Sequence, residues 1–255
     1  MLAADGADES MMEKIRRILA RVGAWADDLL YPENVLCLCC DHALGEEDQD
    51  GICPSCRMAL LRLARQQEER EAKETEKLPE GIDYIHAAFV YEGPVRRLIH
   101  RLKYESVRAA AIPLARQMAY LPSGEEEIIV PVPTDRKRER QRGFNQSSLL
   151  AKHIAKELGM KMETALVRTK TRRPQTGLSA GERQENLVGC MAASDAVNGR
   201  RVLLVDDVYT TGATVCEAAR ALREAGARSV GVFAAARPAG DLDEEKDPFF
   251  LPPKR

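Results

Sequence analysis

Short apolar runs and helical patterns alternate along the second half of the chain. The apolar runs predict strands at His86–Tyr91, Ile128–Val132, Glu163–Arg168, Arg201–Val205 and Ser229–Ala235. Between them, apolar residues recur at helical spacing over Val95–Tyr104, Val107–Tyr120, Gln146–Leu158 and Ala213–Ala225. This alternation predicts an α/β fold, a mostly parallel sheet flanked by helices. Such sheets bind ligands at the carboxyl ends of their strands, so the residues that follow each apolar run are the candidates for a site.

The first 80 residues have a different pattern. Residues 10–30 predict an amphipathic helix with a polar face of mixed charge, which is typical of a packing helix and not of a membrane helix. Residues 54–77 begin with Pro54 and predict a helix that runs into a charged linker before residues 78–81 break it. We therefore expect four parts: an N-terminal helix (1–35), a cysteine-containing segment with a linker helix (36–80), the α/β domain (81–240) and a mobile tail (241–255).

Five of the seven cysteines lie between Cys37 and Cys56. Cys37 with Cys40, and Cys53 with Cys56, form two C-x2-C pairs separated by twelve residues. Four thiolates at this spacing suit tetrahedral Zn²⁺, and a site made of four cysteines is structural and not catalytic. We predict a small zinc knuckle here. Three alternatives remain at this stage: Cys39 could replace Cys37, His42 could be a ligand, or the cysteines could be incidental.

Composition narrows the classes of protein. The chain has 255 residues, with 38 Lys and Arg against 40 Asp and Glu, so its surface as a whole is not basic, although local basic patches remain possible. No apolar run approaches the roughly 20 residues of a membrane span, and the acidic start lacks the layout of a secretory signal. We expect a cytoplasmic protein, where clustered cysteines favour metal binding over disulfides. Aromatic residues are 5% of the chain, which limits base stacking.

The residues after Val205 carry the clearest chemistry. An apolar strand ends in Asp206 and Asp207, and a turn rich in hydroxyl groups then leads into a helix. Backbone N–H groups at a helix start bind phosphate, and a glycine such as Gly212 allows close approach. The two carboxylates could accept hydrogen bonds from vicinal hydroxyls, so the pattern fits a ribose 5-phosphate. The alternative is that the two acids only cap a loop. The P-loop and dinucleotide motifs are absent from the sequence.

The segment Val202–Thr214 resembles the phosphoribosyl pyrophosphate (PRPP) signature of type I phosphoribosyltransferases, and residues 29–237 resemble the ComF family. The wider resemblance is carried by Leu30-Tyr31-Pro32, Tyr91–Arg96, Leu102–Tyr104, Val130–Pro133, Arg142–Gln146, Gln175–Leu178, Arg183 and Asn186. It implies a type I phosphoribosyltransferase-like sheet with a four-cysteine zinc knuckle at its N-terminal side, a PRPP site that works with Mg²⁺, and a link to competence.

The resemblance also assigns residues. PRPP-binding residues would be Asp206, Asp207, Thr210, Thr211, Gly212, Ala213, Thr214, Arg136 and Lys137, and catalytic residues Asp206, Asp207 and Arg183. Thr134–Phe144, with a net charge of +3, would hold the pyrophosphate, although a solvated turn or a nucleic-acid contact is the alternative. Lys170–Ala193 resembles a flexible catalytic loop, and Arg168 beside it would bring charge to the leaving group. Asn145 is a predicted helix N-cap, and Phe144 a core residue.

Two hypotheses about function follow. The first is a PRPP-dependent transferase that passes phosphoribosyl to a nitrogen nucleophile, linked to competence and DNA uptake. The alternative is a factor that binds single-stranded DNA or competence proteins, with a regulatory PRPP or nucleotide site. No general base stands out, because His86, His100 and His153 are better explained as structural residues. The knuckle and the helices near Tyr91–Tyr104 could form the hood over the acceptor.

Overall fold

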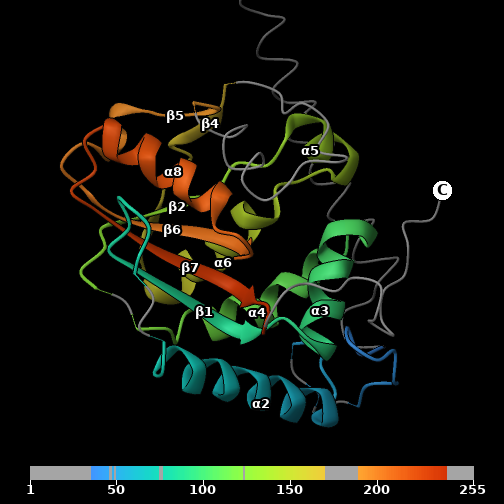
Figure 1. Ribbon diagram of the computed structural model, residues 1–255. Helices are drawn as coiled ribbons and strands as arrows, with labels where there is room; N and C mark the ends of the chain where they lie inside the picture. The colour runs from blue at the N-terminus through green and yellow to red at the C-terminus, as the bar shows by residue number, and fades with distance from the viewer. Residues whose placement is uncertain are drawn as a thin grey trace, which may run out of the picture.

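A five-stranded parallel sheet forms the centre of the computed structural model, which describes residues 36–45, 48, 50–74, 77–122, 124–169 and 189–239. The strand order is β1-β7-β6-β2-β3 (Figure 1). The strands are β1 (Tyr84–Val90), β2 (Ile128–Pro131), β3 (Lys161–Met162), β6 (Arg201–Val208) and β7 (Ser229–Arg237). All four pairings in this sheet are parallel, which confirms the predicted α/β class.

Helices cover both faces of the sheet. α4 (Ala111–Met118) and α6 (Gln146–Leu158) pack on one face, and α8 (Ala213–Glu224) packs on the other (Figure 1). α2 (Pro54–Glu71) lies along the edge strand β1, and α3 (Gly93–His100) stands beside the carboxyl end of that strand. The layers are therefore helix, sheet, helix, with α2 as an additional cover for one edge.

Alternation along β6 divides its side chains between two cores. Leu203 and Val205 pack in the core shared with α4 and α6, whereas Val202 and Leu204 pack in the core shared with α8. Successive side chains of a strand point to opposite faces, so a strand covered on both faces is apolar throughout. The buried β6 delivers its last residues, including both aspartates, to the carboxyl end of the sheet.

The prediction of a single strand over Glu163–Arg168 was wrong. β3 ends at Met162 in the main sheet, and β4 (Leu166–Arg168) pairs antiparallel with β5 (Met191–Ala193) in a separate two-stranded sheet. Leu166 packs in the core between α8 and the main sheet, so it is buried without pairing with a strand of that sheet. An apolar run predicts that a segment is buried, but it does not identify the element against which the segment packs.

Two helical segments are more irregular than predicted. After α3 the chain makes a π-helical turn, η1 (Arg101–Glu105), which ends at Ser106 with φ 57°. The next predicted helix opens as a 3-10 turn, η2 (Arg108–Ala110), before α4. A 3-10 turn η3 (Asp195–Val197) precedes β6.

The basic stretch that we expected to be a loop contains the short helix α5 (Arg136–Arg142). Asp135 caps it, because its side chain accepts hydrogen bonds from the backbone N–H groups of Lys137 and Arg138. Gly143 ends it at φ 80°. Asn145 caps α6 by accepting from Ser147 N at 3.1 Å, which confirms the predicted N-cap.

The predicted N-terminal helix and the tail from residue 241 onward lie outside the described residues. α2 begins at Pro54 as predicted. None of the helices in the described part of the chain has the length and apolar composition that crossing a membrane requires.

Candidate functional site

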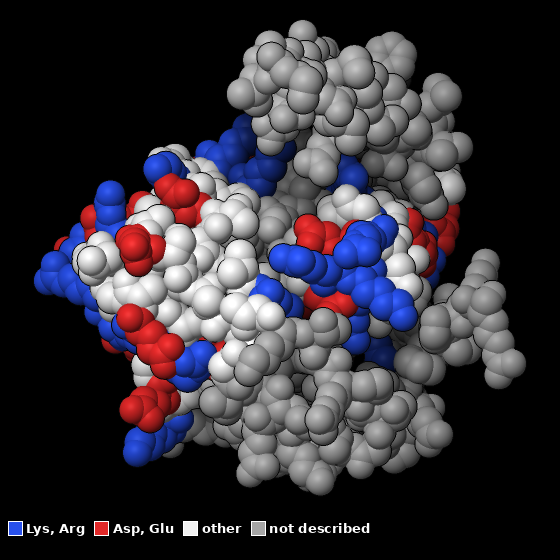
Figure 2. Space-filling model, turned by 90° about the horizontal axis from the view of Figure 1, so that it is seen from above, with Lys and Arg blue, Asp and Glu red and all other residues white. Residues whose placement is uncertain are grey.

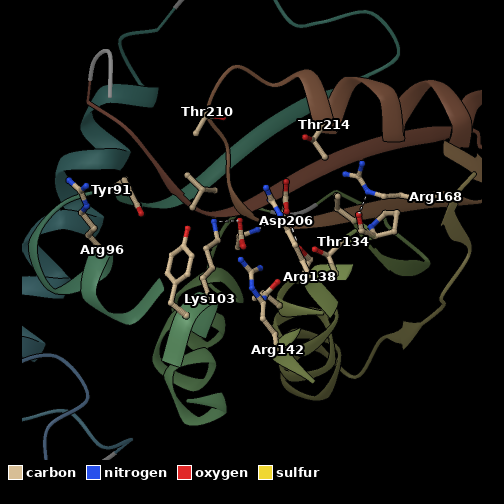
Figure 3. A pocket seen from close by; sticks show the side chains of 17 residues that line it. Tyr91, Arg96, Lys103, Thr134, Arg138, Arg142, Arg168, Asp206, Thr210 and Thr214 are labelled. Atoms are coloured by element: carbon tan, nitrogen blue, oxygen red, sulfur yellow. Dashed lines mark hydrogen bonds and ion pairs between the residues drawn. The ribbon is translucent and has the colours of Figure 1, made fainter. Parts of the chain in front are cut away.

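A cleft of about 310 Å³ opens where β6 and β2 end (Figure 3). Its walls come from the end of β6, the following loop and α8, the segment after β2 with α5, the end of β4, and the π-helical turn η1. Five basic side chains line it against two carboxylates. The basic residues are Arg96, Lys103, Arg138, Arg142 and Arg168. The cleft therefore favours an anionic ligand.

Asp206 lies at the floor of the cleft and is only 8% exposed. Its Oδ1 accepts hydrogen bonds from Ser147 Oγ at 3.0 Å and from the backbone N–H of Asp207 at 2.9 Å. Burial and the neighbouring Asp207 carboxylate raise the pKa of Asp206 to about 7, against the lowering effect of these hydrogen bonds. Both aspartates belong to β6 itself, so the strand is longer than the predicted Arg201–Val205.

Lys103 reaches from η1 to the second carboxylate. Its Nζ lies 2.9 Å from Asp207 Oδ1, and the two side chains are 22% and 15% exposed. Burial lowers the pKa of Lys103, but the charge and hydrogen bond of Asp207 outweigh this effect and hold the pKa above its usual value. The ammonium group therefore neutralises one of the two carboxylates in the cleft.

The loop after β6 leads into the N-terminus of α8, and Thr210 and Thr214 from it line the cleft (Figure 3). Thr211, Gly212 and Ala213 belong to the same turn without lining the cleft. Gly212 has φ 74°, and an added Cβ would lie 2.6 Å from Tyr209 Oη. Only glycine fits there without displacing Tyr209. The turn leads into the first residues of the twelve-residue helix α8, and Thr214 places this N-terminus, where N–H groups can bind an anion, at the cleft.

α5 presents two of its basic side chains to the cleft and others to solvent. Arg138 and Arg142 line the cleft, whereas Arg136 and Lys137 are exposed and do not line it. The Arg142 guanidinium lies 5.5 Å from the centre of the Tyr104 ring, and burial lowers the pKa of Arg142. Figure 2 shows Lys and Arg side chains gathered over α5, with acidic side chains among them.

Two buried nitrogen atoms at the cleft have no hydrogen-bond partner within the described residues: Gln146 Nε2 and Arg168 Nη1. Gln146 is 2% exposed, and Arg168 is held by a hydrogen bond from its Nε to Pro133 O at 2.9 Å. Both residues line the cleft. An unpaired buried donor is costly, so these two atoms indicate a ligand with acceptor oxygens.

The structure thus brings Asp206, Asp207, Thr210, Thr214 and the predicted Arg168 to one cleft. Arg183 lies outside the described residues, so its predicted role is not tested. The sequence analysis did not assign Lys103, Gln146 or Ser147, which come from helices far from β6 in sequence. The only sequence signal for them was their place within the family motifs or next to the predicted N-cap. None of His86, His100 and His153 lines the cleft.

The four predicted ligand cysteines form a second candidate site. The Sγ atoms of Cys37, Cys40, Cys53 and Cys56 lie within 4.8 Å of one another. Tetrahedral zinc with Zn–S bonds of about 2.3 Å requires Sγ separations of about 3.8 Å, so the cluster fits a zinc knuckle. Burial alone would raise the pKa of the Cys37 thiol. Hydrogen bonds from the backbone N–H groups of Cys53, Cys39 and Cys40 outweigh this effect and lower the pKa to about 7. Cys39 is not part of the cluster.

Comparison with known proteins adds independent findings. A family model described as a phosphoribosyl transferase domain matches residues 145–252. The DNA utilization protein YhgH of Escherichia coli K12 is 36% identical over 156 residues, which cover 58% of this chain and 69% of that protein. Competence protein ComFC of Bacillus subtilis 168 is 26% identical over 215 residues, covering 80% of this chain and 85% of that one.

A solved structure with a similar sequence is the glutamine PRPP amidotransferase from B. subtilis, complexed with ADP and GMP. It is 25% identical, has a TM-score of 0.38, and the match covers 51% of this chain. The chain spans about a quarter of that enzyme, 26% of its length. The match to YhgH covers more than two thirds of that relative, and the family model matches the segment that contains Asp206, Asp207 and the turn after β6. The chain therefore belongs to the ComF family and carries a phosphoribosyltransferase domain.

Proposed function

We propose that the cleft binds PRPP and that the protein transfers its phosphoribosyl group to a nitrogen nucleophile. The observation that carries this proposal is the set of groups that the cleft brings together. Thr210 and Thr214 at the start of α8, the Asp206–Asp207 pair, and the basic residues Arg138, Arg142 and Arg168 all line it (Figure 3). These groups match the parts of PRPP, which are a 5-phosphate, ribose hydroxyls and a pyrophosphate.

The electrostatics of the cleft support the same ligand. Five cationic side chains exceed what one phosphate needs, and they suit a ligand with phosphate groups at two ends. Gln146 Nε2 and Arg168 Nη1, which have no hydrogen-bond partner among the described residues, would donate to oxygen atoms of such a ligand. The Lys103–Asp207 pair reduces the repulsion between the carboxylates and the phosphates.

The reaction would be a displacement at C1 of the ribose. The bond from C1 to the pyrophosphate oxygen breaks, a C1–N bond forms on the opposite face, and pyrophosphate leaves with the electron pair while the nitrogen loses its proton. Positive charge develops on the sugar ring, and the Asp206 and Asp207 carboxylates would stabilise it. Arginines of α5 and β4 would neutralise the departing pyrophosphate. Asp206 and Asp207, the two carboxylates that line the cleft among the described residues, would hold Mg²⁺ when it binds with the ligand, and the ion would supply charge neutralisation.

Calorimetry with PRPP and Mg²⁺ tests the site. We expect binding to the wild type, and a loss of affinity of about 100-fold or more when Asp206 and Asp207 both become Asn. Glu127→Gln is the control, because Glu127 lies just before β2, at the opposite end of the sheet. Equal heats for the wild type and the double variant would overturn the assignment. Pyrophosphate release, screened across bases and ammonia, then separates a transferase from a binding protein.

A second candidate function is binding of single-stranded DNA, with the PRPP site as a regulator. The observation that favours it is the row of exposed basic residues on α5, including Arg136, Lys137 and Arg140. The family relatives are described as DNA utilization and competence proteins. In this case affinity for DNA should fall steeply with salt, as expected when phosphate contacts release counterions.

The position of α5 allows the two functions to be separated. Arg136→Ala with Lys137→Ala changes the exposed face, and Arg138→Ala with Arg142→Ala changes the cleft face. DNA binding should depend on the first pair. The second pair should matter for PRPP, and a loss of PRPP affinity in the first pair as well would support the predicted pyrophosphate role of Arg136 and Lys137. A flat salt response with unchanged DNA affinity in both variants would exclude DNA binding through α5.

A further inference from the structure

Asp41 links the four-cysteine knuckle to the main domain. It follows the cluster residue Cys40 directly and has φ 59°, so it sits at the turn that ends the first cysteine pair. Its carboxylate pairs with the guanidinium of Arg101 through Oδ1, and its Oδ2 lies 3.7 Å from Arg97 Nη2. A negatively charged side chain of the knuckle therefore contacts the start of η1.

Arg101 depends on that contact. Its side chain is 6% exposed, and a buried guanidinium is costly without a charged partner. Its Nε makes no hydrogen bond within the described residues and lies 3.6 Å from Glu105 Oε2. Asp41 is thus the closest acid to Arg101 that the structure describes. Displacement of Asp41 would leave Glu105, at 3.6 Å, as the remaining acid in ion-pair distance of Arg101 among the described residues, and we expect the turn around it to adjust.

The same turn supplies one of the five basic residues of the cleft, Lys103. η1 carries Arg101 at its start and Lys103 two residues later, and Lys103 Nζ contacts Asp207 Oδ1 at 2.9 Å. π-helical turns are rare and occur frequently at functional sites. One short turn therefore contacts the knuckle with one side chain and the carboxylate of the cleft with another.

We propose that Asp41 and Arg101 are positioning residues for the cleft: the metal-loaded knuckle sets the place of Lys103 beside Asp207, so metal occupancy of the knuckle and ligand affinity of the cleft are linked. This inference rests on the proposed function only in its use of PRPP as the probe. Linkage is reciprocal in binding free energy, so ligand binding must also tighten the binding of metal.

A second ion pair between knuckle and main domain provides a matched control. Asp50 lies in the knuckle, also has a positive φ of 59°, and pairs with Arg116 of α4. Arg116 does not line the cleft. Asp50→Asn and Asp41→Asn each remove one acid that ties the knuckle to the main domain, but only the second contact leads to Lys103.

The test measures the affinity of zinc-loaded protein for PRPP with Mg²⁺ by calorimetry. We expect Asp41→Asn to weaken binding about tenfold and Asp50→Asn to change it less than twofold. Lys103→Met should weaken binding on its own, and adding Asp41→Asn to it should have little further effect, because both changes act through one contact. A purely structural role would instead give equal losses for Asp41→Asn and Asp50→Asn, and independent losses in the double variant.

Zinc release to a chromogenic chelator gives a readout that needs no PRPP. The Lys103→Met variant should release zinc several-fold faster than the wild type. The double variant with Asp41→Asn should release zinc at the same rate as Asp41→Asn alone. If the wild type does not bind PRPP, the proposed function fails, and the release rates still decide the linkage. Equal release rates for the wild type and Lys103→Met, or equal PRPP affinities for the wild type and Asp41→Asn, would overturn the inference.

Discussion

Asp206 lies between a second carboxylate and a hydroxyl group, and this setting determines how its charge depends on pH. Because its pKa in the folded protein is raised to about 7, the folded state binds a proton that the unfolded state releases near pH 4. The free energy of unfolding must therefore fall as pH rises from about 4 to about 7. Asp206 therefore lowers the stability of the folded protein at neutral pH, and it does so at the position where a ligand with hydroxyl groups would bind.

We predict that Asp206→Asn stabilises the protein at pH 8 by roughly 1–3 kcal/mol, and that the gain shrinks toward zero as pH falls to 4–5. Asparagine can still accept from Ser147 and from the Asp207 N–H, so only the charge is removed. Urea unfolding of both proteins between pH 5 and 8 measures the difference. Asp195→Asn, at an exposed aspartate in η3, is the control. A gain that does not depend on pH would contradict the explanation.

The local half of this site could be predicted from sequence. Asp206, Asp207 and the threonines follow one another along the chain, so their order alone indicates a strand, a turn and a helix start. Lys103 could not be found in this way, because a π-helical turn brings it to Asp207 and helical periodicity does not predict such a turn. The split of α5 into cleft-lining and exposed arginines is likewise a property of how the helix is oriented, and the sequence predicted no helix there.

The contact between α2 and β1 depends on a partly buried carboxylate, that of Glu71. Glu71 Oε1 accepts from the backbone N–H of Ala87 at 2.7 Å and from Gln67 Nε2 at 2.9 Å, and its Oε2 lies 2.8 Å from His86 Nδ1. Burial alone would raise the pKa of Glu71, but these hydrogen bonds outweigh it and hold the pKa below its usual value. The charged form therefore stabilises the fold above about pH 4, and this contribution is lost as pH falls through the folded pKa.

We expect Glu71→Gln to cost about 1 kcal/mol of unfolding free energy at pH 7 and less at pH 3, where protonation begins to remove the charge. Chemical denaturation at the two pH values measures this. Glu69→Gln is the matched control, since Glu69 lies on the same helix, is 57% exposed and pairs with Arg65. Its effect should stay below about 0.5 kcal/mol at both pH values. Equal costs for Glu71→Gln at pH 7 and pH 3 would show that packing, and not charge, holds the contact.

Most elements followed from the apolar pattern, since four of the predicted strands and the helices over residues 146–158 and 213–225 correspond to elements of the structure. The exceptions share one cause. β3 has two residues and β4 three, which is too short for a period to be visible, and β5 lies in a stretch where we expected no strand. Their pairing is decided by contacts with α8 and β2, which are distant in sequence.

The knuckle and the sheet share one apolar core. Cys37, Leu38 and Ile52 belong to the same buried cluster as Phe89 of β1 and Phe233 of β7. A change in the knuckle should therefore be felt by the whole molecule and not by a separate small unit. Bound zinc would contribute its binding free energy to the stability of that common core.

We predict one zinc per chain by elemental analysis, and a single thermal transition that moves down by about 10 °C or more when a strong chelator removes the metal. Cys53→Ser should show the low transition without chelator, and Cys216→Ser, on α8 away from the cluster, should resemble the wild type. Retention of the wild-type transition after complete removal of zinc would refute a structural role for the metal.

The pairing of β1 with β7 has a consequence for biosynthesis. Tyr84 stands in register with Gly231, so the earliest strand of the sheet hydrogen-bonds to the latest one. A ribosome releases β1 long before its neighbour exists, and unpaired strand edges invite aggregation. Until β7 is synthesised, α2 is a cover that the structure gives to this strand. α2 would thus shield β1 from pairing with other chains while the rest of the sheet is synthesised.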